Sequence, residues 1–521
     1  MGPIIRICSC VAGAALLLAA APADARGTIA DYVRARAAAA EGADRTALAG
    51  FSAALAADPN PVVALRAYRQ ALIVGDLPLA LRALTILNAA NQLPADAALL
   101  QLADAVARKD RRAVDAAFDR IAAGPFEFVL PILRAWRSIE ARRDPYPDLR
   151  VGDANPLTRR YAGEQRELML IATGEYDRAG LATLLAGGSA VMRDAADLLA
   201  GRGDRKGAAV LLAGAAPERR AKPTLGFGAA RLLLRVADDL AGQGAAAGTI
   251  PIVFARSALL MEPGNQRGWL VLADALFRER ATGAALSALA EIDPKGPFSA
   301  AAEALRIRAA TSADPTRAVA LAAEAADRVN ASADTVGRHA DTLMTAERFA
   351  DAAVAYQRAR DRRGGEPTVL DDLRIGNALD RAGSWAEAAP YLDRALAQAP
   401  DDPEVLNAVG YARLERGVDL SGARKLLERA LAARPTDAAI VDSVGWAYLL
   451  TGEPARALPL LERAAAADPT DPVIAEHLGD ALWALGRRFE ARYAWRAAAL
   501  DTAGSTATRL AARIAQGPPA R

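Results

Sequence analysis

The chain has 521 residues, which is too long for one compact core and predicts several domains or one elongated array. It is 52% hydrophobic but only 5% aromatic, because much of its apolar content is alanine, the best helix former. The formal charge of +2 argues against a partner bound mainly by charge, such as nucleic acid, although a local charged patch stays open.

Residues 1–25 have the features of a cleaved secretory signal. A basic Arg6 precedes an apolar stretch over residues 11–21, and the small residues at 23–25 form a cleavage motif. We expect cutting after Ala25 and a periplasmic or secreted protein. Both cysteines lie before the apolar stretch rather than at the cleavage point, so a lipoprotein is the less favoured alternative. No later segment is long and apolar enough to predict a membrane-spanning helix.

From residue 26 to 334 the chain has helical periodicity with weak repeat signals. We predict N-terminal helical repeats over 26–145, degenerate helical repeats with loops over 146–228, and further degenerate repeats over 229–334. Loops or bends are expected at 142–156 and 216–228, where proline, glycine and charged residues gather. No run alternates apolar and polar residues for long enough to require a strand, so the predicted class is all-α.

Residues 335–502 carry a clear internal repeat, and 503–521 are predicted to be a flexible C-terminal tail. One glycine recurs at intervals of 34, 35 and 34 residues inside a helical run, although glycine costs about 1 kcal/mol against alanine there. A small residue follows each glycine in the second half of the unit, and a proline closes the unit. These positions are Gly376, Gly410, Gly445 and Gly479; Ala388, Ala423, Ala457 and Ala491; and Pro400, Pro435 and Pro469.

With these residues, segment 335–502 resembles the tetratricopeptide repeat family. The resemblance implies a right-handed α-solenoid in which each unit is a helix A, a turn and a helix B. It also implies that small residues stand where helices A and B cross. Gly445 would then permit a close approach that any side chain would prevent. The last units, with "IVDSVGWAYLLTG", look most like bacterial envelope and periplasmic repeat scaffolds.

Residues for catalysis or metal binding are scarce. His339 and His477 are the only histidines, so a zinc site built from histidine and cysteine is not expected, and both are interpreted as surface or packing residues. No nucleotide-binding or nucleophile motif stands between a strand and a helix. We therefore predict no cofactor, no metal and no enzymatic activity. The less favoured alternative is a cell-wall-acting enzyme with a helical solenoid.

Family resemblance places one face of each helix A toward a partner-binding groove. The polar residues at that face could bond a peptide backbone and the aromatic ones could hold its side chains. The alternative is that the aromatic rings only fill space between units. The predicted groove residues are Asn377, Asn407, Tyr411, Asp442, Trp446, Glu476, Asp480 and Trp483. Arg374, Asn377 and Asn407 match the carboxylate-clamp pattern of the family only in part, so a carboxylate clamp is not supported.

The expected function is that of a non-enzymatic, exported scaffold or adaptor that binds protein or peptide partners in the bacterial cell envelope. Among the proteins it resembles, some present a peptidase with its substrates and others help exopolysaccharide secretion or outer-membrane assembly. The sequence does not choose between these, and it leaves the oligomeric state open.

Overall fold

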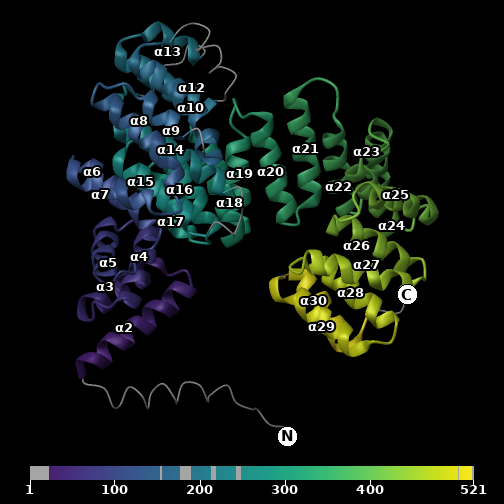
Figure 1. Cartoon of the computed structure of the whole chain (residues 1–521). Coiled ribbons are helices and arrows are strands. Elements are labelled where there is room, and N and C mark those ends of the chain that lie inside the picture. Colours follow the sequence, from purple (N-terminus) through teal and green to yellow (C-terminus); the bar gives the residue numbers. More distant parts are fainter. Residues whose placement is uncertain are drawn as a thin grey trace. The chain divides into compact units, whose positions relative to one another are not determined.

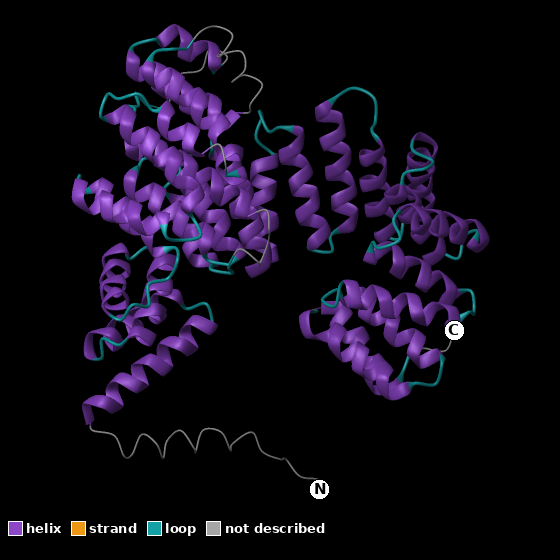
Figure 2. Cartoon of the chain, in the orientation of Figure 1, coloured by secondary structure: helices purple, strands orange, loops and turns teal. Residues whose placement is uncertain are grey.

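The computed structural model describes residues 23–152, 155–176, 189–212, 217, 219–241, 248–502 and 504–518. Within these ranges every regular element is a helix and no strand occurs, which confirms the all-α prediction (Figures 1 and 2). None of the described helices is long and apolar enough to span a membrane. Residues 1–22 of the predicted signal lie outside the described residues.

The structure divides into two compact units, an N-terminal unit ending at Ala309 and a C-terminal unit beginning at Ala310. The division falls inside helix α18 and does not coincide with any of the boundaries predicted at 145, 228 and 334. Helices of the N-terminal unit are α2 (Ala23–Ala40), α3 (Asp44–Ala57), α4 (Pro61–Val74), α5 (Leu77–Ala89), α6 (Ala97–Ala107), α7 (Arg111–Ala122), η1 (Glu127–Val129), α8 (Leu130–Glu140), α9 (Tyr146–Gly152), α10 (Pro156–Thr173), α12 (Ser189–Arg202), α13 (Arg205–Leu211), α14 (Leu225–Ala241), α15 (Ile250–Met261), α16 (Gln266–Arg278), α17 (Thr282–Ala290) and α18 (Ser299–Ala313).

The core of the N-terminal unit is built around α14 and α15. The two helices pack against each other, and α15 also contacts α4 and α6, which are far away in sequence. Gly228 on α14 lies against the indole of Trp136 on α8, so a Cβ at this position would be only 2.1 Å from the ring. The sequence "LGFG" at 225–228 is therefore the start of a buried helix, whereas we expected a loop there.

Both predicted loop regions contain helical residues. Segment 142–156 holds the short helix α9, and α14 begins at Leu225 within segment 216–228. The prolines and glycines that suggested loops lie near the ends of these helices, where proline at the first turn costs little.

A buried ionic cluster ties α12, α14 and α15 together. Arg231 on α14 is 3% exposed and bonds Asp194 of α12, at 2.9 Å, as well as Glu262 at the end of α15. Arg219 pairs with the same Glu262 at 3.0 Å and with Asp197. A guanidinium removed from water is tolerated here because carboxylates surround it.

The C-terminal unit is a regular succession of helical hairpins. Each helix packs on the next one in sequence, and the first helices of successive hairpins also touch, as α22 does with α24, α24 with α26 and α26 with α28. The helices are α19 (Pro315–Ala326), α20 (Ala333–Thr345), α21 (Phe349–Arg363), α22 (Val369–Arg381), α23 (Trp385–Gln398), α24 (Pro403–Glu415), α25 (Leu420–Ala433), α26 (Ala438–Leu450), α27 (Pro454–Ala467), α28 (Pro472–Ala484), α29 (Arg488–Ala498), η3 (Ala499–Asp501) and α30 (Gly504–Gln516).

Caps and turns repeat with the same period as the hairpins. Asp402, Asp437 and Asp471 each cap the first helix of a hairpin by accepting hydrogen bonds from two backbone N–H groups of its first turn. The turns inside the hairpins contain glycines with left-handed backbone, such as Gly452 with φ of 82°. Pro400, Pro435 and Pro469 lie between one hairpin and the next. Each hairpin thus has its own sequence signals for the start of its first helix, for the turn between its helices and for its end.

The central glycines lie where the two helices of a hairpin cross. A Cβ at Gly445 of α26 would lie 2.8 Å from the Leu461 side chain of α27 and 3.4 Å from the Ala457 carbonyl oxygen. Added Cβ atoms would come similarly close to the opposite helix at Gly376, Gly410 and Gly479. The small residues Ala388, Ala457 and Ala491 are fully buried at the same crossings. Close packing offsets the helical cost of glycine.

The end of the chain corrects the prediction of a flexible tail over 503–521. Residues 504–516 form α30, which packs on α29 and buries Leu510 completely. Its apolar Leu510 and Ile514 join a cluster with Trp483 and Trp495. The final "QGPPAR" suggested fraying, but the spacing of Leu510 and Ile514 gives α30 an apolar face to bury.

Candidate functional site

The eight predicted groove residues all lie on first helices of the hairpins, α22, α24, α26 and α28. Their exposure falls toward the C-terminus. At the position just after the central glycine, Asn377 is exposed, Tyr411 is half-buried, Trp446 is 6% exposed and Asp480 is 5% exposed. The open part of the predicted groove is therefore the surface of α22 and α24.

Three predicted residues meet around His477, which lies on α28. The imidazole stacks on the Trp446 indole with ring centroids 3.9 Å apart and an interplanar angle of 12°. Its Nδ1 is 2.8 Å from a carboxylate oxygen of Asp442, and the Tyr411 ring centroid is 6.4 Å away. The indole N–H of Trp446 donates to Glu415. This cluster joins the first helices of three successive hairpins through side chains that are mostly withdrawn from water.

The same cluster is rich in hydrogen-bond acceptors. Burial, together with Glu415, Asp442 and Glu476, raises the pKa of Tyr411 well above its ordinary value, so its phenol keeps its proton. Asn407 and Asp442 hold equivalent positions in adjacent units. Each has a buried side-chain oxygen for which no hydrogen-bond partner exists among the described residues. Buried acceptors of this kind are normally satisfied, so these two call for a donor such as water or a partner N–H.

Glu476, Asp480 and Trp483 face another helix of the same chain, so the groove prediction needs correction for the last unit. Arg509 of α30 bonds both oxygens of Glu476, at 3.0 and 2.9 Å, and Arg513 bonds Glu476 and Asp480. Gly517 lies so close to Trp483 that a Cβ there would be 2.3 Å from the indole. Helix α30 therefore occupies the surface that we had assigned to a partner.

Comparison with known proteins identifies the repeat. Residues 373–438 and 416–472 match a family model described as tetratricopeptide repeat. The chain contains tetratricopeptide repeats. A comparison with curated proteins gives no match. Repeats of this family generally mediate contacts between proteins, and proteins of this fold are generally not catalytic.

Solved structures of tetratricopeptide proteins are similar to parts of the chain. A thermophilic protein from Thermus thermophilus is 20% identical, covering 36% of this chain and 98% of that one with a TM-score of 0.32. A protein from Parabacteroides merdae ATCC 43184 is 12% identical, covering 47% and 96% with a TM-score of 0.40. MamA from Desulfovibrio magneticus RS-1 is 18% identical, covering 33% and 97% with a TM-score of 0.26.

Sequence reasoning missed the roles of Glu415 and the arginines of α30 in the tetratricopeptide array, and it did not choose between a surface and a packing role for His477. We interpreted His477 as an ordinary surface or packing residue, and the structure buries it to 6% exposure as the centre of a cluster. A signal was present, because Asp442 lies three residues before the central glycine of its repeat and His477 lies two residues before that of the next one, which places the two side chains on adjoining first helices. The described residues contain no cluster of histidine, cysteine, aspartate and glutamate suited to a metal ion.

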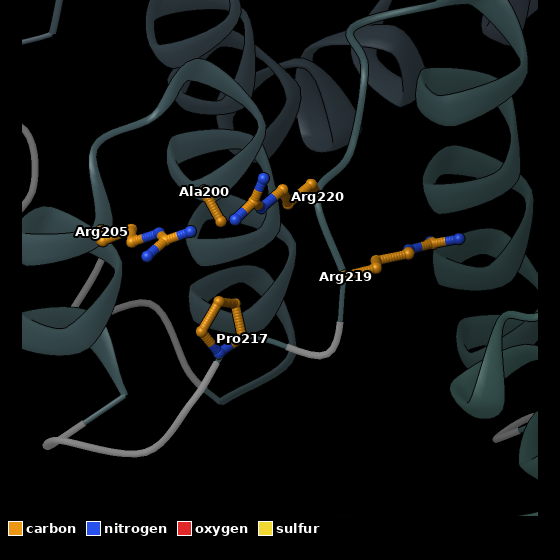
Figure 3. A pocket seen from close by; sticks show the side chains of 5 residues that line it. All are labelled: Ala200, Arg205, Pro217, Arg219 and Arg220. Atoms are coloured by element: carbon orange, nitrogen blue, oxygen red, sulfur yellow. The ribbon is translucent and has the colours of Figure 1, made fainter.

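The N-terminal unit has a basic pocket of about 350 Å³, which contains none of the predicted site residues. It is lined by Ala200, Arg205, Pro217, Arg219 and Arg220. The side chains of Arg205 and Arg220 reach toward the space beside Ala200, whereas Arg219 points away, toward its carboxylate partners (Figure 3). Both Arg205 and Arg220 are exposed.

Proposed function

We propose that the chain is an exported, non-enzymatic scaffold that binds a polypeptide partner on the first helices of its tetratricopeptide array. The observation that carries the proposal is the continuous contact of α22, α24, α26 and α28, which lines up their equivalent faces in one surface. The part of that surface on α22 and α24 has the exposed Asn377 and the half-buried Asn407 and Tyr411, whose amide and phenol groups can bond a peptide backbone.

The partner contact is placed on α22 and α24, because farther along the array the equivalent side chains are occupied. Asp442 and Trp446 contact His477 and Glu415, and Glu476 is bonded by two arginines of α30. A partner that reached these residues would have to displace contacts within the chain. In contrast, Asn377 is exposed, and no hydrogen bond of its side chain is recorded among the described residues.

Site-specific photocrosslinking in cells tests the proposal. With a photoreactive amino acid in place of Asn377, we expect a reproducible crosslinked partner. The matched control places it at Lys425, which is exposed on the outward face of α25. A groove contact predicts crosslinks at 377 and none of the same mass at 425. Equal products at both positions, or none at 377, would contradict a partner site on α22 and α24.

Mass spectrometry of the crosslinked product also decides between the envelope roles. A peptidase or its substrate would support a scaffold that presents substrates to a peptidase. Subunits of an exopolysaccharide synthase or of an outer-membrane assembly would support the second role. Both roles rest on the resemblance of the last repeats to envelope proteins.

Export makes a separate prediction at the N-terminus. The order of a basic residue, an apolar stretch and small residues at 23–25 favours cleavage after Ala25. N-terminal sequencing of the protein from cells should therefore begin at Arg26 or within a few residues of it. An intact Met1 would exclude cleavage, and a diacylated cysteine would show a lipoprotein instead.

A further inference from the structure

The outward face of α29, the second helix of the last hairpin, has large apolar side chains in contact with water. Phe489 is 78% exposed, Tyr493 is 68% exposed, and Leu500, in the turn that follows, is 87% exposed. The spacing of four residues places Phe489 and Tyr493 along one line of α29, and Leu500 lies just beyond the end of that helix, in η3. The opposite side of α29 is buried through Ala491 and Trp495. An exposed row of this kind is a candidate interaction surface.

The last hairpin, α28 and α29, differs from the earlier hairpins at positions 489 and 493. Relative to the buried alanine of each second helix, Phe489 and Tyr493 stand two residues before and two residues after. Residues at the equivalent positions are exposed in every earlier hairpin, and none of them is aromatic. They are Ala350 and Val354, Ala386 and Pro390, Ser421 and Lys425, and Ala455 and Pro459. These positions are exposed to solvent in every hairpin. The rings of Phe489 and Tyr493 are therefore not needed for packing one hairpin on the next.

A basic row runs beside the aromatic row. Arg488, Arg492 and Arg496 are spaced by four residues and so follow one line of α29. The guanidinium groups of Arg488 and Arg492 lie 5.2 Å from the Trp483 ring, and Arg492 donates to the Ile514 carbonyl. Across the described part of the chain, no ion pair with a carboxylate is recorded for these three arginines. Their positive charge is thus not neutralised locally.

Charge and shape together select the occupant. The exposed apolar side chains lie on a single helix and the short η3 after it, which favours a broad partner surface over an enclosed peptide. A second copy meeting it face to face would bring two rows of arginines together, which like-charge repulsion opposes. An anionic lipid surface fits both rows, because phosphate headgroups attract arginine and the interface accepts aromatic and leucine side chains.

We propose that the outward face of α29 docks on a bilayer that contains anionic phospholipid. In this arrangement Phe489, Tyr493 and Leu500 enter the headgroup region, while Arg488, Arg492 and Arg496 pair with phosphates. The chain lies on the surface and does not span it. The proposed membrane contact is on α29, whereas the proposed peptide contact is on α22 and α24 (Figure 1). The two contacts therefore use different helices and can be tested independently.

Vesicle co-sedimentation of the full chain tests the docking. We expect binding to vesicles of phosphatidylglycerol and phosphatidylcholine, weaker binding as salt rises, and little binding to pure phosphatidylcholine. The double variant Phe489→Ser/Tyr493→Ser should bind roughly tenfold more weakly or worse, since both rings lose their insertion. Arg496→Glu should weaken binding by about fivefold or more through the lost attraction to the lipid charge.

The matched control is Val354→Ser, at the position of α21 equivalent to Tyr493 and 57% exposed. This control variant should bind vesicles like the wild type. Residues 1–25 are the same in every variant, so a difference in vesicle binding between the α29 variants and the wild type must come from α29. Because the changed side chains are exposed, circular dichroism should show unchanged melting. Equal binding of wild type and both α29 variants, no binding to anionic vesicles, or equal binding to neutral ones would overturn the proposal. Self-association that disappears in the double variant, without vesicle binding, would assign the face to a second copy.

Discussion

Trp446→Ala should lower the free energy of unfolding by about 3–5 kcal/mol, the usual cost of removing a large aromatic ring from a packed site. The indole is 6% exposed, stacks on His477 and donates a hydrogen bond to Glu415. Its removal leaves a cavity beside His477 and an acceptor without its donor. A ring in an open groove would have been dispensable for stability, so the burial changes the expected result from lost binding to lost stability.

Thermal or denaturant melts followed by circular dichroism measure this effect. Tyr493→Ala is the control, because Tyr493 is an aromatic residue of the same array that is 68% exposed, and its removal should change stability little. If Trp446→Ala melts like the wild type and only partner capture falls, then the ring lies open to a partner and the inter-unit packing described above is wrong.

Gly445→Leu should force α26 and α27 apart and cost about 1–3 kcal/mol or more. The first added carbon already falls 2.8 Å from the Leu461 side chain, which is itself fully buried, and three further carbons need space beyond it. Since each unit is stabilised mainly by its neighbours, the damage should spread along the last hairpins before it reaches the rest of the chain. Hydrogen exchange should then show lost protection in α26–α29 first.

Gly337→Ala provides the contrast for that substitution. Gly337 is also inside a first helix, α20, but a Cβ there would meet no atom within 4 Å. Alanine at 337 should therefore stabilise the protein by up to about 1 kcal/mol through helix propensity. Gly445→Ala should not stabilise the protein, because the added Cβ would lie too close to Leu461. If both alanine variants gain stability equally, Gly445 does not hold two helices in close contact.

The repeat could be predicted from sequence because its physical requirements are local. A crossing without room for a side chain demands glycine, and a capped helix start demands a residue such as Asp437, so both recur every 34 or 35 residues. That one face of each first helix lines a groove followed from the resemblance to the family, and it stays a prediction. How much of that face stays open did not follow from the resemblance, since burial depends on the long side chains of the neighbouring helix, such as His477 against Trp446.

The N-terminal unit shows where pattern reasoning ends. Its core depends on contacts between helices far apart in sequence, such as α15 with α4 and α6. No regular spacing of residues in the sequence predicts these contacts. The glycine at 228 resembled a loop residue, but its role is the close approach of Trp136 from another helix. At the other end, α30 has no repeat signature. Its arginines at 509 and 513 were not matched to Glu476 and Asp480 because that pairing joins one repeat to a helix outside the series.

Helix α30 also limits how this array could lengthen or shorten in evolution. Every hairpin before the last presents its neighbour with a surface that another hairpin can cover, so an internal duplication of 34 or 35 residues would keep the register. The last hairpin instead presents two carboxylates, Glu476 and Asp480, that are bonded by the arginines of α30. A hairpin appended after α29 would face acids without their cations. Gains and losses of repeats should therefore occur upstream, with α28, α29 and α30 inherited together as one terminal block.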